Sequence, residues 1–301
     1  MDHKELLASL TPDQRLALTA RSDWPGLWYL GAHFGAILGL GWAIWVGVPF
    51  WGALLPLQGI LIVFTFTLLH ETVHDTPFAS AGLNRWAGRA AGFLLALPPL
   101  WFRYFHLAHH RWTNDPERDP ELAEGKPDGW RAYLAYLSGL PVWWSHLTTL
   151  WRNARGGCRD AFVPENARAR VTREARWMLA LYAPIGVAMV AEPRLLWVWP
   201  IPALLGQPFL RAYLLAEHGR CPPVANMLEN SRTTLTGWLV RTLAWNMPYH
   251  AEHHAYPTVP FHKLPVFHGL TRPHLRQTER GYWRFHARVL RALRRGEEKP
   301  L

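Results

Sequence analysis

The sequence predicts an all-α integral membrane protein in which four transmembrane helices form two hairpins beneath a cytosolic, histidine-rich helical cap. Three observations predict this fold. Apolar residues gather in four long blocks, basic residues gather in the segments around those blocks, and histidines gather in three clusters beside them. The blocks indicate the fold class, the basic residues the orientation, and the histidines the chemistry.

The four apolar blocks are the predicted membrane spans. A helix needs about 20 apolar residues to cross a hydrocarbon core about 30 Å thick. Residues 27–48 and 49–69 predict a first hairpin, and residues 177–191 and 195–216 predict a second. A buried core helix is the alternative for each block, and the last block is interrupted by prolines and Arg211. The pairing of the blocks favours membrane spans, and tryptophans at block edges suit the membrane interface.

The distribution of charge predicts the orientation of the spans. The formal net charge is +10, and nearly all Lys and Arg lie before residue 27, between 70 and 176, or after 217. The two predicted hairpin tips contain one basic residue, Arg194. By the positive-inside rule, both termini and all three histidine clusters are expected on the cytoplasmic side of a multi-pass protein. The sequence has no basic recognition motif, so we expect no nucleic-acid partner.

Further helices are predicted in the polar segments. Thr11 and Pro12 suit the N-cap and first position of a short helix before the first span. Residues 83–100 are apolar but contain two arginines, which predicts a helix lying at the membrane interface and not a fifth span. Further predicted helices lie within residues 101–112, 130–151 and 235–245, and the tail from residue 270 is basic and helical. We expect one domain over residues 1–301, with a cap formed by residues 70–176 and 217–301.

The histidine clusters predict a metal site. On a helix, residues at i, i+3 and i+4 lie on one face, so each cluster is expected to direct its imidazoles to one place. In a chain with 16 His in 301 residues, two H-x-x-H-H patterns are improbable by chance. Eight imidazoles exceed what one metal can accommodate, so two metals are implied, and iron, zinc and copper all accept such ligands. The clusters are His70 and His74; His106, His109 and His110; and His250, His253 and His254.

Two other metal proteins are alternatives. Residues 70–74 read HETVH, the H-E-x-x-H pattern of zinc peptidases with Glu71 as general base. That class needs one metal and does not explain eight clustered histidines. A zinc transporter would be expected to hold its ligands within the spans, whereas these clusters lie outside them.

The three clusters HETVH, HLAHH and HAEHH, in this order and with apolar hairpins before and between them, resemble the histidine boxes of the membrane fatty acid desaturase superfamily. The similarity covers nearly the whole chain. The segment from Asn246 to Pro265, NMPYHAEHHAYPTVPFHKLP, is most similar to that of acyl desaturases.

The resemblance implies a non-haem di-iron site with O2 as co-substrate. It carries over the eight clustered histidines as ligands and adds His218, which lies about thirty residues before the third box; Asn246 is a possible ligand through water. Carboxylates near the clusters are expected to accept the free N–H of ligating imidazoles. These carboxylates are Glu71, Asp75, Asp115, Glu217 and Glu252; the remaining histidines, such as His262, His268 and His274, are expected to be structural.

The implied function is that of an oxidoreductase of lipid metabolism that introduces a C=C bond into an alkyl chain of a lipid or acyl thioester. Electrons are expected from an external donor of the ferredoxin or cytochrome b5 type, since nothing in the chain resembles a fused donor domain. A carotenoid or lipid hydroxylase or ketolase of the same superfamily is the nearest alternative. A metal-binding membrane protein without catalysis is the alternative from another class.

Overall fold

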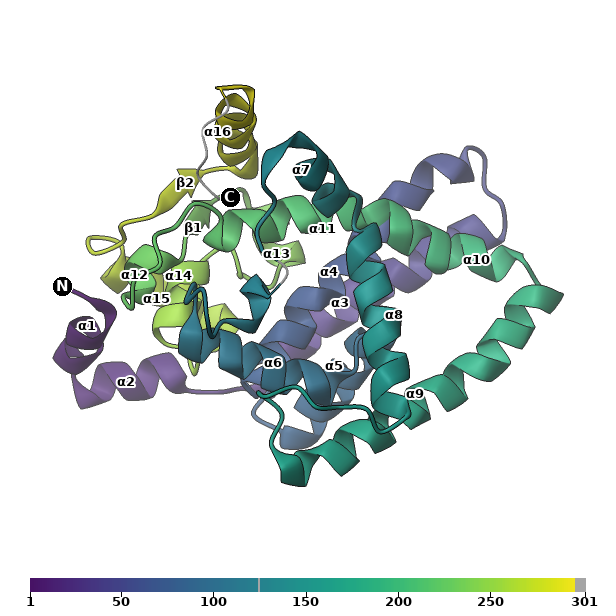
Figure 1. Ribbon diagram of the computed structural model, residues 1–301, viewed down its shortest axis with the longest axis horizontal. Helices are drawn as coiled ribbons and strands as arrows, with labels where there is room; N and C mark the ends of the chain where they lie inside the picture. The colour runs from purple at the N-terminus through teal and green to yellow at the C-terminus, as the bar shows by residue number, and fades with distance from the viewer. Residues whose placement is uncertain (124, 296–301) are drawn as a thin grey trace.

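The computed structural model describes residues 1–123 and 125–295, most of which are helical (Figure 1). The helices before the second histidine cluster are α1 (His3–Ser9), α2 (Pro12–Thr19), α3 (Asp23–Trp45), η1 (Trp51–Leu54), α4 (Leu55–Val73), α5 (Ala81–Leu94) and α6 (Pro99–Trp112). The middle of the chain forms η2 (Pro120–Leu122), α7 (Gly129–Ser138), α8 (Leu140–Ala154), α9 (Glu165–Ala191), α10 (Arg194–Val198) and α11 (Pro200–His218). The C-terminal part forms α12 (Met227–Asn230), α13 (Trp238–Leu243), α14 (His250–Ala255), η3 (Phe261–Lys263), α15 (Leu264–Thr271) and α16 (Tyr282–Arg295).

Two short strands are the exception to the all-α prediction. β1 (Thr233–Leu235) and β2 (Thr278–Arg280) pair in parallel, with Thr233 opposite Thr278. The predicted cap extends to residue 301, and its last six residues lie outside the described part of the chain.

The first predicted helix is confirmed. The Thr11 hydroxyl accepts a hydrogen bond from the backbone N–H of Gln14, and the Gln14 side chain accepts one from the backbone N–H of Thr11. This reciprocal capping satisfies N–H groups that the first turn of a helix leaves free. Pro12 fits the first position because its missing N–H is not needed there.

Two stretches are long and apolar enough to cross a membrane: Pro12–Trp45, which includes α3, and Trp51–Val73, which includes α4. The turn between them covers residues 46–50, so the second candidate span begins at Trp51 and includes His70. The candidate spans extend beyond the predicted bounds of 27–48 and 49–69, the first toward the N-terminus and the second toward the C-terminus.

The second pair of predicted spans has a different form. The predicted span 177–191 is the C-terminal half of the 27-residue helix α9, whose first half is rich in arginine. Helix α9 and the α10–α11 segment pass the span criterion only together, with a bend of 116° at the break between them. The described residues thus contain two candidate spanning helices, or three if the bent pair is counted as one span.

Two other predicted helices are divided. The segment 83–100 forms α5 and the start of α6, which are separated by a break before Pro99. The segment 130–151 forms α7 and α8, which meet at Gly139 with a positive φ of 67°. Each break has a local cause, because proline cannot continue a helix that precedes it and glycine adopts positive φ at little cost.

Helices α4 and α11 form the centre of the molecule and approach at two glycines. A Cβ atom placed on Gly59 would lie 1.9 Å from the carbonyl oxygen of Pro202, and one on Gly206 would lie 2.2 Å from the carbonyl carbon of Gly59. Glycine therefore sets how closely the two backbones approach, as small residues do between packed membrane helices. The same two helices carry His70 and His218 at their C-terminal ends.

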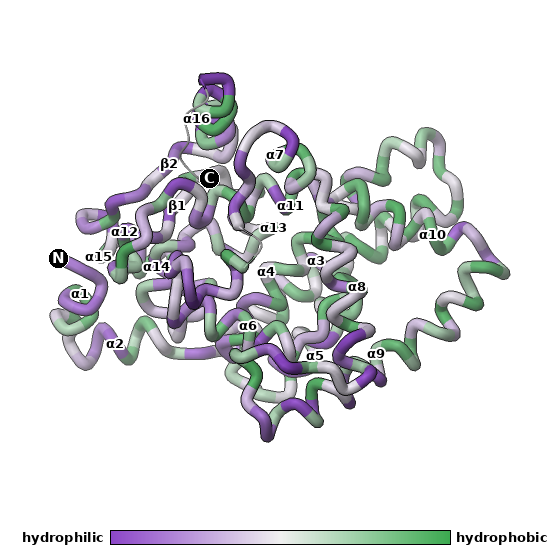
Figure 2. Tube along the Cα trace, in the orientation of Figure 1, coloured by the Kyte–Doolittle hydropathy of each residue, from purple (hydrophilic) through white to green (hydrophobic). Residues whose placement is uncertain are grey.

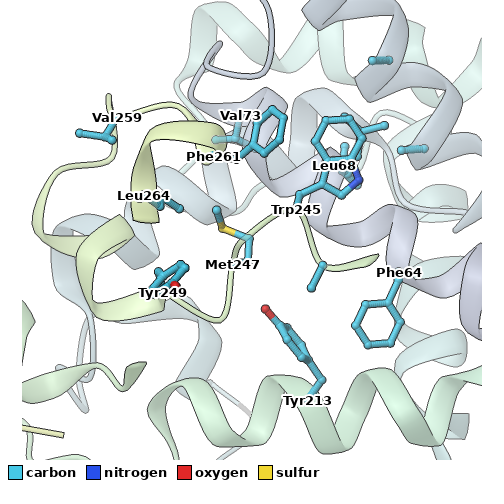
Figure 3. Packing of buried hydrophobic residues seen from close by; sticks show 14 of the residues in the cluster. Phe64, Leu68, Val73, Tyr213, Trp245, Met247, Tyr249, Val259, Phe261 and Leu264 are labelled. Atoms are coloured by element: carbon cyan, nitrogen blue, oxygen red, sulfur yellow. The ribbon is translucent and has the colours of Figure 1, made fainter. Parts of the chain in front are cut away.

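The C-terminal elements pack against this helix pair. Figure 3 shows Phe64 and Leu68 of α4 and Tyr213 of α11 in one apolar cluster with Trp245 and Phe261. Trp245 and Phe261 are fully buried. Figure 2 shows the consequence for the whole molecule: hydrophobic residues dominate the α3, α4 and α10 end, whereas hydrophilic residues are frequent around α1, α2, β1 and β2.

Candidate metal centre

Four helices bring nine histidines together. His70 lies in the last turn of α4 with His74 as its C-cap, the second cluster lies on α6, His218 ends α11, and the third cluster lies on α14. Seven of the nine are buried, and His74 and His110 are half-buried. The residues are His70, His74, His106, His109, His110, His218, His250, His253 and His254.

The first set of imidazoles combines all three clusters. Ring nitrogens of His70, His106, His110 and His253 lie within 4.8 Å of one another. The Nε2 atom of His74 lies 3.1 Å from Nε2 of His106, which places His74 in the same set. We call these five residues the first set.

The second set consists of His109, His218, His250 and His254. Ring nitrogens of His109, His218 and His254 lie within 4.8 Å of one another. Nε2 of His218 lies 2.8 Å from Nε2 of His250 and 3.2 Å from Nε2 of His109. The two sets adjoin, because the rings of His110 and His254 stack with centroids 4.0 Å apart.

The expectation that each cluster points to one place is wrong for the second and third clusters. His106 and His110 belong to the first set, and His109 between them belongs to the second. His253 belongs to the first set although His254 belongs to the second. Consecutive residues on a helix point about 100° apart, so one cluster can serve two neighbouring sites.

The donor atoms fit a pair of metal ions. Among the described residues, neither ring nitrogen of His70, His110 or His253 has a hydrogen-bond partner. Buried polar atoms without a partner are costly unless a missing ligand satisfies them. A metal with bonds of about 2.1 Å to nitrogen holds ligand atoms at most about 4.2 Å apart, close to the spread within each set. Imidazole nitrogens that face each other at about 3 Å suit a shared cation.

Acidic and polar groups surround the second set. Nδ1 of His109 lies 2.9 Å from Asp119 and 3.1 Å from Glu121, and Nδ1 of His250 lies 3.3 Å from Glu217. The Nδ1 atom of His218 lies 3.2 Å from the backbone oxygen of Asn230. Such contacts fix the tautomer and the ring orientation of a ligating histidine.

Asp119 and Glu121 were not predicted to contact the histidines. Asp119 is buried and also accepts hydrogen bonds from the backbone N–H groups of Asn114 and Glu121. The available signal was a carboxylate in the turn directly after the second cluster, where Asp119-Pro120 ends the helical pattern. Nothing in the local spacing distinguishes Asp119 from Asp115, which pairs instead with Arg118.

The predicted carboxylates have different surroundings. Glu71 lies 3.5 Å from Nδ1 of His253, and Glu217 contacts His250, as expected. Asp75 pairs with Arg103 at 3.0 Å. Glu252 contacts His268 at 2.5 Å and accepts hydrogen bonds from the hydroxyl groups of Thr233 and Thr271, so it anchors α14 and does not face the metal sets.

The contacts of Glu71 argue against a peptidase. Its Oε2 accepts hydrogen bonds from the Thr76 hydroxyl at 2.9 Å and from the backbone N–H of Phe261 at 3.1 Å, and its side chain is fully buried. A general base must be within reach of the water that it activates. Glu71 of the HETVH segment is instead held by neighbouring elements.

Asn246 and His268 contact groups outside the two sets. The Asn246 amide donates a hydrogen bond to the carbonyl oxygen of Phe261 at 3.2 Å, and its backbone has a positive φ of 57°. His268 contacts Glu252, consistent with a structural role. Ligation by Asn246 through water stays a prediction.

The electrostatics distinguish His109 from the other histidines of the two sets that lie outside the spans. Burial lowers the pKa of His74 to about 3 and holds the pKa of His250, His253 and His254 well below the ordinary value. Burial also acts to lower the pKa of His109, but Glu121 and Asp119 outweigh it and raise that pKa above 6.5. Neutral imidazoles are ready to bind a metal, whereas His109 must first lose a proton.

Comparison with known proteins adds a family match. The model of the family described as fatty acid desaturase matches residues 41–288. The chain is 24% identical over 271 residues to the sphingolipid delta(4)-desaturase of Gallus gallus, covering 88% of this chain and 76% of that protein. It is 26% identical over 203 residues to the sphingolipid delta(4)-desaturase/C4-monooxygenase of Mus musculus, covering 66% and 58%.

A plant protein shows a similar level of identity. The chain is 22% identical over 276 residues to the chloroplastic omega-3 fatty acid desaturase of Glycine max, covering 81% of this chain and 59% of that protein. The matches thus span from 58% to 76% of the length of these three relatives.

Proposed function

This chain belongs to the fatty acid desaturase family, and on that premise we propose that it is an O2-dependent oxidoreductase that introduces a C=C bond into the alkyl chain of a lipid or acyl thioester. The observation that carries the proposal is the convergence of nine histidines into two adjoining sets. The family match and the relatives named above support the same reaction class.

We assign two irons to the two sets. His70, His74, His106, His110 and His253 would hold one iron, and His109, His218, His250 and His254 would hold the other, with Asn246 as a possible ligand through water. When bound, the iron pair supplies O2-dependent removal of hydrogen from adjacent alkyl carbons, because no acid or base side chain can engage an unactivated C–H bond.

The chain itself supplies position and a dry environment. Phe102 stacks on His106 with ring centroids 5.5 Å apart, and Phe66 lies 5.4 Å from Phe102. These rings give the first set an apolar border on the α4 and α6 side, which excludes water and suits an alkyl chain. Asp119 orients His109 through a hydrogen bond at Nδ1, and Glu217 and Glu71 place a carboxylate 3.3 and 3.5 Å from Nδ1 of His250 and His253.

We propose a single desaturase-like domain over residues 1–301 with four spans in two hairpins, near residues 27–48, 49–69, 177–191 and 195–216. The 116° bend after α9 supports the second hairpin, because it turns the chain back toward the side where α9 begins. The cap, both termini and the histidine sets would face the cytoplasm by the positive-inside rule.

We propose that an external donor of the ferredoxin or cytochrome b5 type docks at a basic cavity near the second set. This cavity of about 370 Å³ is lined by Arg220, Arg232, Arg288, Arg291 and Arg295. The backbone N–H of Arg232 donates a hydrogen bond to the carbonyl oxygen of Glu217, the neighbour of His218. Charge complementarity speeds association with an acidic partner. Reduction rates that do not fall with salt, or that are unchanged by Arg291→Glu, would contradict this docking site.

The reaction is tested by expressing the chain in a host and analysing its lipids by mass spectrometry. Desaturation removes two hydrogens from a product, whereas hydroxylation adds one oxygen. The hydroxylase or ketolase is the second candidate because one matched relative is named as both a desaturase and a monooxygenase. Purified protein that lacks iron and consumes no O2 with any lipid would favour a metal-binding protein without catalysis.

A further inference from the structure

A second cavity lies apart from the histidine sets, between α4, α5, α6 and α9. It has a volume of about 750 Å³ and is open on one side. Five arginines line it, together with the two carboxylates Asp75 and Glu174. We call it the arginine cavity; its arginines are Arg85, Arg89, Arg103, Arg170 and Arg173.

Most of this positive charge is not neutralised within the described residues. Arg103 pairs with Asp75, and Oε2 of Glu174 is occupied by the backbone N–H of Leu100 at 2.7 Å. Glu174 also interacts electrostatically with Arg89 and Arg170, so five arginines share two carboxylates in this cavity. Helices α5 and α9 therefore direct surplus guanidinium groups at one concave surface.

The other wall of the cavity is apolar. Phe93 of α5 and Trp177, Met178 and Leu181 of α9 line it. On α9, the arginine-rich half ends at Arg176 and the apolar half begins at Trp177. The cavity therefore crosses the boundary between a basic and an apolar region.

Two exposed tryptophans mark this boundary. Trp86 of α5 is 68% exposed and Trp177 of α9 is 66% exposed, and both line the cavity. Tryptophan is enriched at the headgroup level of membranes. The guanidinium of Arg89 lies 5.2 Å from the Trp86 ring centroid, which holds it beside the opening. A membrane lipid could thus enter from the side.

We propose that the arginine cavity binds an anionic glycerophospholipid, with the phosphate held by Arg85, Arg89, Arg170 and Arg173 and the upper acyl chain against Trp177 and Leu181. Guanidinium groups bind phosphate through paired, charge-assisted hydrogen bonds. Its volume suits a headgroup and the adjoining chain segments. An excess of arginines over carboxylates favours a net anionic headgroup over a zwitterionic one.

The arginine cavity borders the end of α4, which carries His70 and His74 of the first set. Leu69, Thr72 and Val73 line the cavity and alternate along α4 with His70 and the C-cap His74. A bound lipid would therefore pack against the opposite side of this helix end. The proposal requires a membrane-embedded chain but does not depend on the proposed desaturase reaction.

Native mass spectrometry of the full chain in neutral detergent tests this site. The probes are phosphatidylglycerol, phosphatidylcholine with identical acyl chains, and glycerol 3-phosphate. We expect one phosphatidylglycerol to bind about tenfold more tightly than phosphatidylcholine, and glycerol 3-phosphate to compete poorly because it lacks the chains. Equal affinity for both lipids, or competition by glycerol 3-phosphate as effective as by the lipid, would overturn the proposal.

Two variants locate the binding. Arg89→Gln combined with Arg173→Gln should remove the preference for phosphatidylglycerol, whereas the matched control Arg159→Gln with Arg168→Gln, outside the cavity, should keep it. Ala90→Phe should weaken binding without changing charge, because the exposed Ala90 lines the cavity. If both cavity variants bound the two lipids as the wild type does, the preference for phosphatidylglycerol would arise from general electrostatic attraction at the surface. That result would overturn the proposal. The readout is binding without turnover, so failure of the lipid site and failure of the desaturase activity are distinguishable.

Discussion

The two histidine sets share helices α6 and α14 but differ in the third helix, α4 for the first set and α11 for the second, and they are held in different ways. In the second set, Nδ1 of His109 and Nδ1 of His218 each have an oxygen hydrogen-bond partner, at 2.9 and 3.2 Å, and Nδ1 of His250 lies 3.3 Å from the Glu217 carboxylate. In the first set, among the described residues, His70 and His110 have no hydrogen-bond partner at either ring nitrogen. The second set is oriented by surrounding polar groups, whereas the first depends on the packing of α4, α6 and α14.

This difference has a chemical consequence. Carboxylates close to His109 and His250 make the second set more negative and raise the basicity of its ligands. The first set borders the aromatic residues Phe66 and Phe102. We therefore expect replacement of a single carboxylate to weaken metal binding at the second set. At the first set, we expect metal binding to depend mainly on the ligating histidines themselves.

Removal of one ligand from each set should have the largest effect. We expect His70→Ala and His254→Ala each to abolish product formation and each to lower the iron content from two per chain toward one, because each takes a donor from a different set. Elemental analysis and lipid profiling measure both outcomes. His274→Ala, outside both sets, should retain iron and activity. Loss of iron in this control, or full iron in either ligand variant, would show that the sets are wrongly assigned.

Replacement of Asp119 should weaken the second set selectively. Asp119→Asn removes the buried one of the two carboxylate charges beside His109 while keeping a side chain of similar size, so we expect a loss of about 10- to 100-fold in metal affinity at one of two sites. Competition with a chelator measures the affinity. Asp115→Asn serves as the control, since Asp115 pairs with Arg118 and contacts no histidine. Equal losses in both variants would show that the effect arises from the turn and not from His109.

Replacement of Glu71, the carboxylate beside His253 of the first set, should lower metal affinity less than replacement of Asp119. The Glu71 carboxylate lies 3.5 Å from His253, and a glutamine oxygen at the same place can still accept hydrogen bonds from Thr76 and the Phe261 N–H. We expect Glu71→Gln to lower metal affinity by less than about tenfold, measured with the same chelator. A loss larger than that of Asp119→Asn would reverse the comparison between the sets.

Lowering the pH should release metal from the second set before the first, and this difference should be smaller than the effects of the substitutions above. The pKa of His109 is raised above 6.5 by Glu121 and Asp119 against the effect of burial, so protons compete with metal at His109 near neutral pH and compete more strongly as pH falls. Burial lowers the pKa of His74 to about 3, so protons compete at His74 only in strong acid. We expect metal release in two steps as pH is lowered, the first from the second set. Release in one step would contradict this order.

Several elements were predictable because their signals are local. The Thr11 cap, the apolar block that forms α3 and the helical spacing of His70 and His74 depend on neighbours a few residues away, and the structure contains them. The breaks before Pro99 and at Gly139 were missed, because the apolar pattern continues through both. The contact between Asp119 and His109 was missed because it depends on how the turn after α6 folds back.

The sequence by itself identified the clustered histidines as candidate metal ligands, since helical periodicity relates a spacing of four residues to one face. Only the tertiary structure decided how the imidazoles are shared. His109 and His110 are neighbours in the chain, yet they join different sets because they point about 100° apart and meet different partner helices. The close approach of α4 and α11 at Gly59 and Gly206 brings residues 70 and 218 to the same end of the molecule, and no local pattern encodes that contact.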